Sequence, residues 1–255
     1  MTKTSLDIAA IGDLHFTRNS QGSLQPYLAE VSSRADVLLL CGDLTNYGLP
    51  EEAHLLAAEL GRAIKIPMLA VLGNHDFESG KQEEVRRILV DVGVVVLDGE
   101  PVEVEGVGFV GVKGFAGGFG QRMLEPWGEP SMKQLVRDAI DETLKLESGL
   151  AKLRTPARVV LLHYAPIAGT VEGEPLEIYP FLGSSRLEEP LNRYAVNLVF
   201  HGHAHRGALE GRTRAGVPVY NVAAPLLRRS FPGQIPFRFV SLPVGVVPAS
   251  ADNAA

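Results

Sequence analysis

The chain alternates short apolar runs with longer segments of helical periodicity. Three apolar runs end at glycine followed by polar residues: LDIAAIGD (6–13), ADVLLLCGDL (35–44) and IPMLAVLGNHD (66–76). Apolar runs of this length are typical of strands buried on both faces. Between them, residues 24–34 and 50–64 are predicted helices, and the second opens with proline and acidic residues, as helix N-termini often do. This order predicts a largely parallel inner sheet covered by helices.

The pattern changes after a third predicted helix (81–93) and a strand (94–97). Residues 102–114 hold two strand-like runs with no helix between them, which predicts a hairpin. A glycine-rich loop (115–130) follows, and Ser131 with Gln134 predicts a capping box for a helix that runs to about Leu153. Further strands are expected at 157–166 and 197–201, with closing strands in 207–223 and 237–243. Residues 165–186 are expected to be irregular.

Length and composition predict one domain. The 255 residues are 45% hydrophobic, enough for one large core. We expect a single domain over residues 1–243 and an extended or disordered tail over 244–255, which is rich in Pro, Ala and Ser.

The same composition bears on location and partners. No apolar run approaches the ~20 residues that span a bilayer, and the N-terminus lacks the pattern of a signal peptide. The single cysteine, Cys41, fits a reducing compartment. A cytoplasmic protein with no membrane contact is therefore predicted. The net charge of −6 disfavours binding of a nucleic acid polymer but leaves a small anionic substrate open.

Unusual polar residues follow five of the predicted strands. They are Asp13 and His15, then Asp43, then Asn74, His75 and Asp76, then His163, and finally His203 and His205. Six of the seven histidines lie in these segments, counting His201. The carboxyl ends of strands in α/β sheets are where ligands bind. One-residue spacing, as in Asp13 and His15, turns both side chains to the same side of an extended backbone.

The donor types indicate a metal site. Carboxylate, imidazole and amide oxygen without thiolate favour Mn, Fe, Zn, Ni or similar divalent ions over Ca or a closed structural zinc site. There are too many donors for one ion. Two ions about 3.5–4 Å apart that share a carboxylate would use them well.

The ordered set of motifs resembles the signature of the calcineurin-like metallophosphoesterases. The set is Asp13-Leu-His15, Gly42-Asp43, Gly73-Asn74-His75-Asp76, His163 and Gly202-His203-Ala204-His205, and the resemblance extends from residue 7 to about 225. It implies a four-layer α/β/β/α sandwich, in which helices flank two mixed β-sheets. It also implies a role for each residue: Asp13, His15 and His205 at the first metal, Asn74, His163 and His203 at the second, and Asp43 bridging both. His75 would face the scissile phosphate without binding metal, and Asp76 would orient its imidazole.

The resemblance implies phosphoester hydrolysis by a metal-bridging hydroxide, with manganese as the preferred metal. A hydroxide between two cations is a strong nucleophile at neutral pH, and His75 could protonate the leaving oxygen. The leading prediction is a phosphodiesterase acting on small phosphodiesters or cyclic nucleotides. The alternatives are a phosphomonoesterase (including a phosphoprotein phosphatase), a nuclease, and a scaffold without catalytic activity.

The remaining candidates have weaker signals. His201 is expected to pack behind the site or support it. The loops 114–130 and 165–186 could form a substrate rim, in which aromatic side chains stack on a base and arginines meet phosphate. The candidates there are Tyr164, Phe119, Trp127, Arg122 and Arg206, and ordinary loop packing accounts for each of them equally well.

Overall fold

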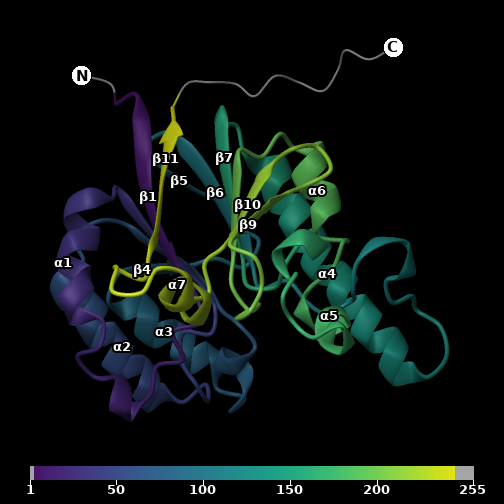
Figure 1. Ribbon diagram of the computed structural model, residues 1–255, viewed down its shortest axis with the longest axis horizontal. Coiled ribbons are helices and arrows are strands. Elements are labelled where there is room, and N and C mark those ends of the chain that lie inside the picture. Colours follow the sequence, from purple (N-terminus) through teal and green to yellow (C-terminus); the bar gives the residue numbers. More distant parts are fainter. Residues whose placement is uncertain (1–2, 245–255) are drawn as a thin grey trace.

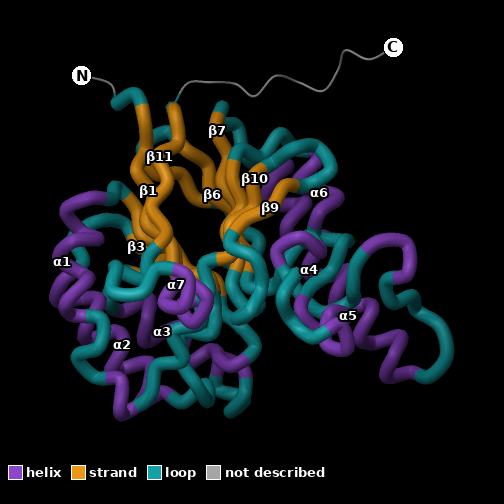
Figure 2. Tube along the Cα trace, in the orientation of Figure 1, coloured by secondary structure: helices purple, strands orange, loops and turns teal. Residues whose placement is uncertain are grey.

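The computed structural model describes residues 3–244, which contain two β-sheets packed between helices (Figures 1 and 2). The first sheet has the strand order β11-β1-β2-β3-β4. Its strands are β1 (Ser5–Ile11), β2 (Val37–Cys41), β3 (Met68–Val71), β4 (Val94–Val96) and β11 (Arg238–Pro243). The four strands β1 to β4 are parallel, and β11 pairs with β1 in the antiparallel direction.

The second sheet has the order β5-β6-β7-β8-β10-β9. Its strands are β5 (Val102–Val104), β6 (Val107–Val112), β7 (Ala157–Leu162), β8 (Leu198–His201), β9 (Glu210–Arg212) and β10 (Pro218–Asn221). The four central strands are parallel, and both edge strands, β5 and β9, pair antiparallel with their neighbours. The predicted hairpin over 102–114 is the β5–β6 pair.

Most helices lie outside the two sheets (Figure 1). The helices are α1 (Gln25–Arg34), α2 (Pro50–Ala63), α3 (Gln82–Asp91), α4 (Pro130–Lys152), α5 (Tyr179–Leu182), α6 (Glu188–Arg193) and α7 (Ala224–Ser230). The last of them, α7, lies between the two halves of the molecule, with Leu227 in the apolar layer between the sheets. Short 3-10 helices are η1 (Arg18–Ser20), η2 (His75–Phe77), η3 (Gly120–Arg122), η4 (Ala168–Thr170) and η5 (Leu176–Ile178). Within the described part of the chain, no helix is long and apolar enough to cross a membrane.

Successive side chains along each strand point to opposite faces of the sheet, so the buried apolar side chains form three layers. Leu38 and Leu40 of β2 face α1, α2 and α3, whereas Leu39 between them faces the other sheet. Phe109 of β6 and Phe200 of β8 meet Leu39 in this central layer. The outer face of the second sheet packs on α4 and α6 through a third cluster. The predicted sandwich of two mixed sheets flanked by helices is therefore confirmed.

Some local predictions differ from the structure. The capping box at Ser131 and Gln134 is wrong: α4 begins at Pro130, its N-cap Glu129 makes no side-chain cap, and the Gln134 amide instead donates to Asp138 at 2.7 Å. Proline at the first helical position needs no capped N–H, which explains how the helix starts without a box. The stretch 165–186 holds η4, η5 and α5 and is not wholly irregular.

The C-terminal segment also brings features that local patterns did not indicate. Helix α7 falls within 224–230, and β11 returns to pair with β1 across the length of the chain. The predicted tail over 244–255 lies outside the described residues except for Val244, whose backbone N–H donates to the Thr4 carbonyl at 2.9 Å.

Candidate metal centre

The polar residues converge at the carboxyl ends of the strands of both sheets, and four of them have a positive φ, which is uncommon for residues other than glycine. Asp13 and His15 are among the four, so the extended backbone expected there is wrong. Asp13, His15, Asp43 and His203 have φ of 53°, 44°, 49° and 68°. They are four of the six residues other than glycine with positive φ in residues 3–244. Such strained conformations persist where the surrounding structure enforces them and cluster at functional sites. The strain thus marks the loops after β1, β2 and β8 as the functional edge.

Two glycines in these loops are required by close approach. A Cβ on Gly73 would overlap the Asp43 carboxylate, and a Cβ on Gly202 would overlap that of Asp13. Glycine at these positions lets the backbone pass directly behind the two carboxylates, which holds each one toward the centre of the site.

Asp13, His15 and His205 form the first donor group, because one potential ligand atom from each lies within 4.8 Å of the others. His205 Nε2 is 2.9 Å from Asp13 Oδ1 and 3.4 Å from His15 Nε2. Two imidazole nitrogens that face each other across a carboxylate repel unless a proton or cation lies between them. The arrangement therefore suits a cation.

Asp43, His163 and His203 form a second group by the same criterion. His163 Nε2 lies 3.3 Å from Asp43 Oδ1 and 3.0 Å from Asn74 Oδ1, so the amide oxygen joins the group. The other ring nitrogen of His163 is 3.0 Å from the Cys41 carbonyl and donates to it, which leaves the Nε2 lone pair free for a metal. His203 Nε2 contacts the Phe181 carbonyl at 3.1 Å, so its Nδ1 keeps a lone pair in the same way.

His75 lies between these groups and forms a third group with His15 and Asp43. Its Nε2 is 4.0 Å from Asp43 Oδ2, and its Nδ1 is 2.7 Å from the Asn46 carbonyl, to which it donates. The prediction that Asp76 orients the His75 imidazole is therefore wrong, since the backbone carbonyl of Asn46 holds this ring. No sequence pattern marks a backbone carbonyl for such a role.

Asp76 instead ties two ligand-bearing loops together. Its fully buried carboxylate accepts from Thr45 N–H at 2.8 Å and Thr45 O–H at 2.7 Å, and from Leu44 N–H at 3.2 Å. It also accepts from Gly73 N–H at 2.8 Å. The loop after β2 carries Asp43 and the loop after β3 carries Asn74, so Asp76 sets the spacing between the two.

The electrostatics of the protein without metal match those of a cation site. Burial lowers the pKa of His203 to about 4 and also lowers that of His15, which keeps both rings neutral, as ligation requires. Burial opposes the charged form of His163, but the adjacent Asp43 carboxylate outweighs it and raises the pKa of His163 to about 9. Burial opposes ionisation of Asp43, but the His163 charge outweighs it and holds the pKa of Asp43 well below its usual range. In the absence of metal, a proton on His163 thus supplies part of the missing positive charge.

His201 lies behind the site. Its ring is fully buried, with Nδ1 2.7 Å from the Gly202 carbonyl and Nε2 2.8 Å from the Thr170 hydroxyl. Both nitrogens are occupied by protein partners, so this ring braces the loop that carries His203.

The candidates for a substrate rim lie in different environments. Tyr164 is buried and its ring centroid lies 4.4 Å from that of His203, so it packs against a candidate ligand. Phe119 packs edge-on against Tyr179. Trp127, Arg122 and Arg206 are exposed on the surface.

The structure thus brings together the seven residues predicted as ligands and His75. They are Asp13, His15, Asp43, Asn74, His163, His203 and His205. Asp43 takes part in two of the three donor groups, the position that a shared carboxylate needs. Oxygen and imidazole donors in this mixture fit a pair of divalent transition-metal ions.

Known proteins resemble this chain in sequence and in fold. The calcineurin-like phosphoesterase family model matches residues 6–207. A probable cyclic nucleotide phosphodiesterase of Synechococcus sp. is 28% identical over 227 residues, covering 82% of this chain and 76% of the relative. An uncharacterized protein of Methanocaldococcus jannaschii is 31% identical over 109 residues, 43% of this chain and 44% of that protein.

Among solved structures, the phosphopantetheinyl hydrolase of Mycobacterium tuberculosis matches with a TM-score of 0.67 at 15% identity, covering 93% of this chain and 96% of that one. The protein TT1561 of Thermus thermophilus matches with a TM-score of 0.56 at 14% identity, covering 94% of this chain and 99% of that one. These similarities show a common fold. With the family match over most of the sequence and the donor groups at the strand ends, they establish that the chain belongs to the calcineurin-like phosphoesterases and is a phosphoester hydrolase.

Proposed function

We propose that this protein hydrolyses small phosphodiesters, cyclic nucleotides among them, with two divalent metal ions bound at the strand ends. The observation that carries the proposal is the convergence of three donor groups around Asp43 and His15. Asp13, His15 and His205 would hold one ion, Asn74, His163 and His203 the other, and Asp43 both. When bound, such ions supply a nucleophile at neutral pH and stabilise the charge that develops on the phosphoryl group.

The protein's own residues account for the remaining steps. The Asn46 carbonyl accepts from His75 Nδ1–H, which leaves Nε2 facing the site beside Asp43. A proton carried on His75 Nε2 is therefore the one that would reach the leaving oxygen, a contribution of about 10²–10⁴-fold in typical enzymes. Asp76 would not contact the substrate; it would act by fixing the spacing of the loops that hold Asp43 and Asn74.

The diester preference is supported by the Synechococcus relative, whose description names a cyclic nucleotide phosphodiesterase. The second candidate is a phosphomonoesterase, since the same two-metal chemistry acts on both classes of ester.

The test is turnover of bis(p-nitrophenyl) phosphate beside p-nitrophenyl phosphate, and of 3′,5′-cyclic AMP, with protein reconstituted separately with Mn, Fe, Zn and Ni. We expect metal-dependent cleavage of the diesters, fastest with Mn. Turnover of the monoester alone would exclude the diester proposal. Two bound ions without turnover of any phosphoester would indicate a scaffold.

We also propose that the protein acts in the cytoplasm. Its single cysteine, Cys41, is fully buried in the central apolar layer and forms no disulfide, which suits a reducing compartment. Fractionation of the native cells with detection of the protein in each fraction tests this, and recovery from an oxidising compartment would contradict it.

A further inference from the structure

A half-buried lysine lies beside the candidate metal centre and has no acidic partner. Lys113 follows β6, and its backbone carbonyl accepts from the N–H groups of His163 at 3.1 Å and Tyr164 at 3.0 Å. Its ammonium donates to the Gly114 carbonyl at 2.9 Å. Within residues 3–244, no carboxylate lies within 4.0 Å of Lys113 Nζ. Burial lowers the pKa of this lysine, as expected for a cation withdrawn from water.

The ammonium lies among three aromatic rings. Nζ is 4.5 Å from the ring centroid of Phe115, 5.2 Å from that of Tyr164 and 5.6 Å from that of Phe77. Such cation–π contacts offset part of the hydration that the ammonium loses on burial. The nearby Glu142 carboxylate attracts the ammonium and opposes the lowering of its pKa by burial, but it does not pair with it directly.

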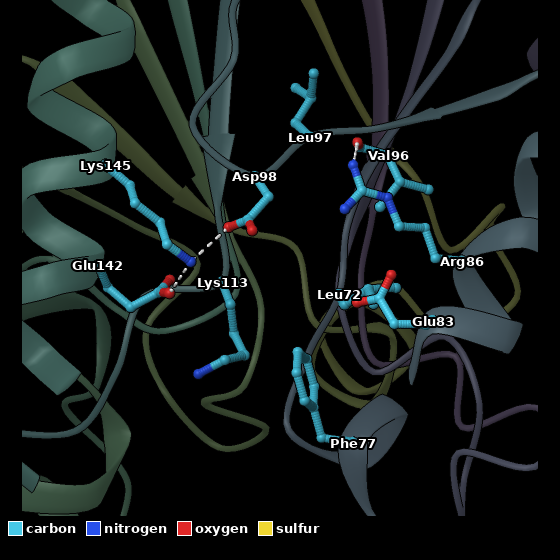
Figure 3. Close-up of a pocket in the computed structure, with 10 residues that line it drawn as sticks. All are labelled: Leu72, Phe77, Glu83, Arg86, Val96, Leu97, Asp98, Lys113, Glu142 and Lys145. Atoms are coloured by element: carbon cyan, nitrogen blue, oxygen red, sulfur yellow. Dashed lines mark hydrogen bonds and ion pairs between the residues drawn. The ribbon is translucent and has the colours of Figure 1, made fainter. Parts of the chain in front are cut away.

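A cavity of about 150 Å³ opens beside this lysine. Figure 3 shows Lys113 and Phe77 at the lower end of this cavity, between Glu142 and Lys145 of α4 on one side and Glu83 and Arg86 of α3 on the other. The lining carries five other charged groups, which are Glu83, Arg86, Asp98, Glu142 and Lys145. Lys145 pairs with both Asp98 and Glu142. Glu142 also accepts from Gly114 N–H, and Arg86 donates to the Val96 carbonyl. Among residues 3–244, neither Lys113 nor Arg86 has a carboxylate within 4.0 Å, and Lys113 is the one of the two that contacts the loop of His163 and Tyr164.

The cavity adjoins the proposed second metal position. Leu72 and Phe77 of its lining flank the loop that carries Asn74 and His75. The Tyr164 ring lies next to Lys113 Nζ on one side and 4.4 Å from the His203 ring centroid on the other. A substrate held at the metals and extending over Tyr164 would bring its far end to the lysine.

We propose that Lys113 and this cavity form a subsite for a second anionic group of the substrate, a carboxylate or a phosphate separate from the scissile one. The inference rests on the proposed phosphoesterase function and narrows it to phosphoesters that carry such a group on one ester arm. An oxyanion there supplies the counter-ion that Lys113 lacks, through charge-assisted hydrogen bonds from Nζ.

The test uses matched substrates. In the first pair, the p-nitrophenyl ester of thymidine 5′-phosphate is compared with the same ester that carries an additional 3′-phosphate. In the second pair, propyl p-nitrophenyl phosphate is compared with 2-carboxyethyl p-nitrophenyl phosphate, which carries an additional carboxylate. Lys113→Met keeps the aliphatic stem and removes the charge. We expect it to raise KM about tenfold to a hundredfold for whichever anionic substrate the wild type prefers. KM for the matched neutral-arm substrates and for cyclic AMP should change less than twofold.

Two control variants accompany this one. Lys113→Arg keeps the charge and should retain most of the preference, and Lys152→Met removes an exposed lysine paired with Glu100 and should change nothing. The wild type should prefer the anionic substrate in one pair more strongly than in the other. The pair with the larger preference identifies the class of anion, phosphate or carboxylate.

Several outcomes would overturn the subsite. In the first, Lys113→Met changes KM equally for both substrates of each pair and lowers Tm. This result would mean that Lys113 only stabilises the cluster of aromatic rings. Another is no preference of the wild type for either anionic substrate.

Failure of the proposed function has a different signature. If no metal-loaded preparation cleaves any of the esters, binding of thymidine 3′,5′-bisphosphate and thymidine 5′-phosphate is compared by calorimetry. A preference for the bisphosphate that Lys113→Met abolishes would retain the subsite and reject the hydrolase. Equal binding of the two nucleotides would reject the subsite as well.

Discussion

Replacement of Asp76 gives the sharpest test of how the site is held. The Asp76→Ala substitution removes the acceptor of four hydrogen bonds in a side chain that is 0% exposed. Three of the four donors are backbone N–H groups, which cannot turn away without moving the loops after β2 and β3. A buried donor left without a partner costs about 1–3 kcal/mol.

Because the Thr45 hydroxyl can rotate to another acceptor, the three backbone groups dominate the estimate. At about 1–3 kcal/mol for each of the three, we expect Asp76→Ala to lower the free energy of unfolding by about 3–9 kcal/mol, a large share of the 5–15 kcal/mol typical of a domain. Thr45→Val, the matched control, removes one donor and keeps the others, and should cost only about 1–2 kcal/mol. Urea unfolding of the metal-free proteins, followed by circular dichroism, measures both losses.

The same variant should also bind metal more weakly, since Asp76 spaces the loops that carry Asp43 and Asn74. Elemental analysis after dialysis against limiting Mn²⁺ reports this loss. If Asp76→Ala instead keeps its stability and both metals and loses only turnover, Asp76 acts on His75 and the loop-bracing role is refuted.

Three further perturbations test other parts of the site. His75→Ala should retain two metals by elemental analysis and lower kcat by about 10²–10⁴-fold. The control variant His54→Ala, on α2, should leave kcat unchanged. Loss of metal from His75→Ala would show that His75 is a metal ligand. Gly202→Ala should lower metal content, because its Cβ would meet the Asp13 carboxylate and the Cys41 carbonyl, whereas Gly169→Ala has open space and should match the wild type in the same measurement. Since His163 has a pKa raised to about 9 in the metal-free protein, a metal must displace its proton below that pH. Mn²⁺ affinity should therefore rise as the pH is raised from about 7 to about 9. Calorimetry in buffers of different ionisation enthalpy should detect the released proton. A Mn²⁺ affinity of the wild type that does not change over this pH range would contradict the assignment of His163 as a ligand.

Local pattern was sufficient for the inner strands and for the identity of the donors. Strands β1, β2 and β3 are apolar over nearly every position because both of their faces are buried, and each ends at a glycine before polar residues. These signals act over a few residues, so they are readable without knowledge of the rest of the chain. The ordered motifs then indicated the family and its four-layer sandwich.

Contacts between distant segments were not readable in this way. The antiparallel pairing of β11 with β1 joins residues more than two hundred positions apart. The short helices within 165–186 have no strong apolar period of their own, and their placement depends on the surfaces they cover. The predicted capping box is absent because α4 begins at Pro130, which places Ser131 inside the first turn and makes Glu129 the N-cap residue.

In the site, local sequence patterns are enough to identify the donor side chains and the order of the strands that carry them. The folded chain sets which atom of each side chain faces the centre and which groups hold it there. The Asn46 carbonyl fixes His75, Asp76 braces two loops, and Lys113 lies among rings from three segments. Backbone carbonyls and N–H groups exist at nearly every residue, so their selection as partners depends on distances that only the folded chain sets.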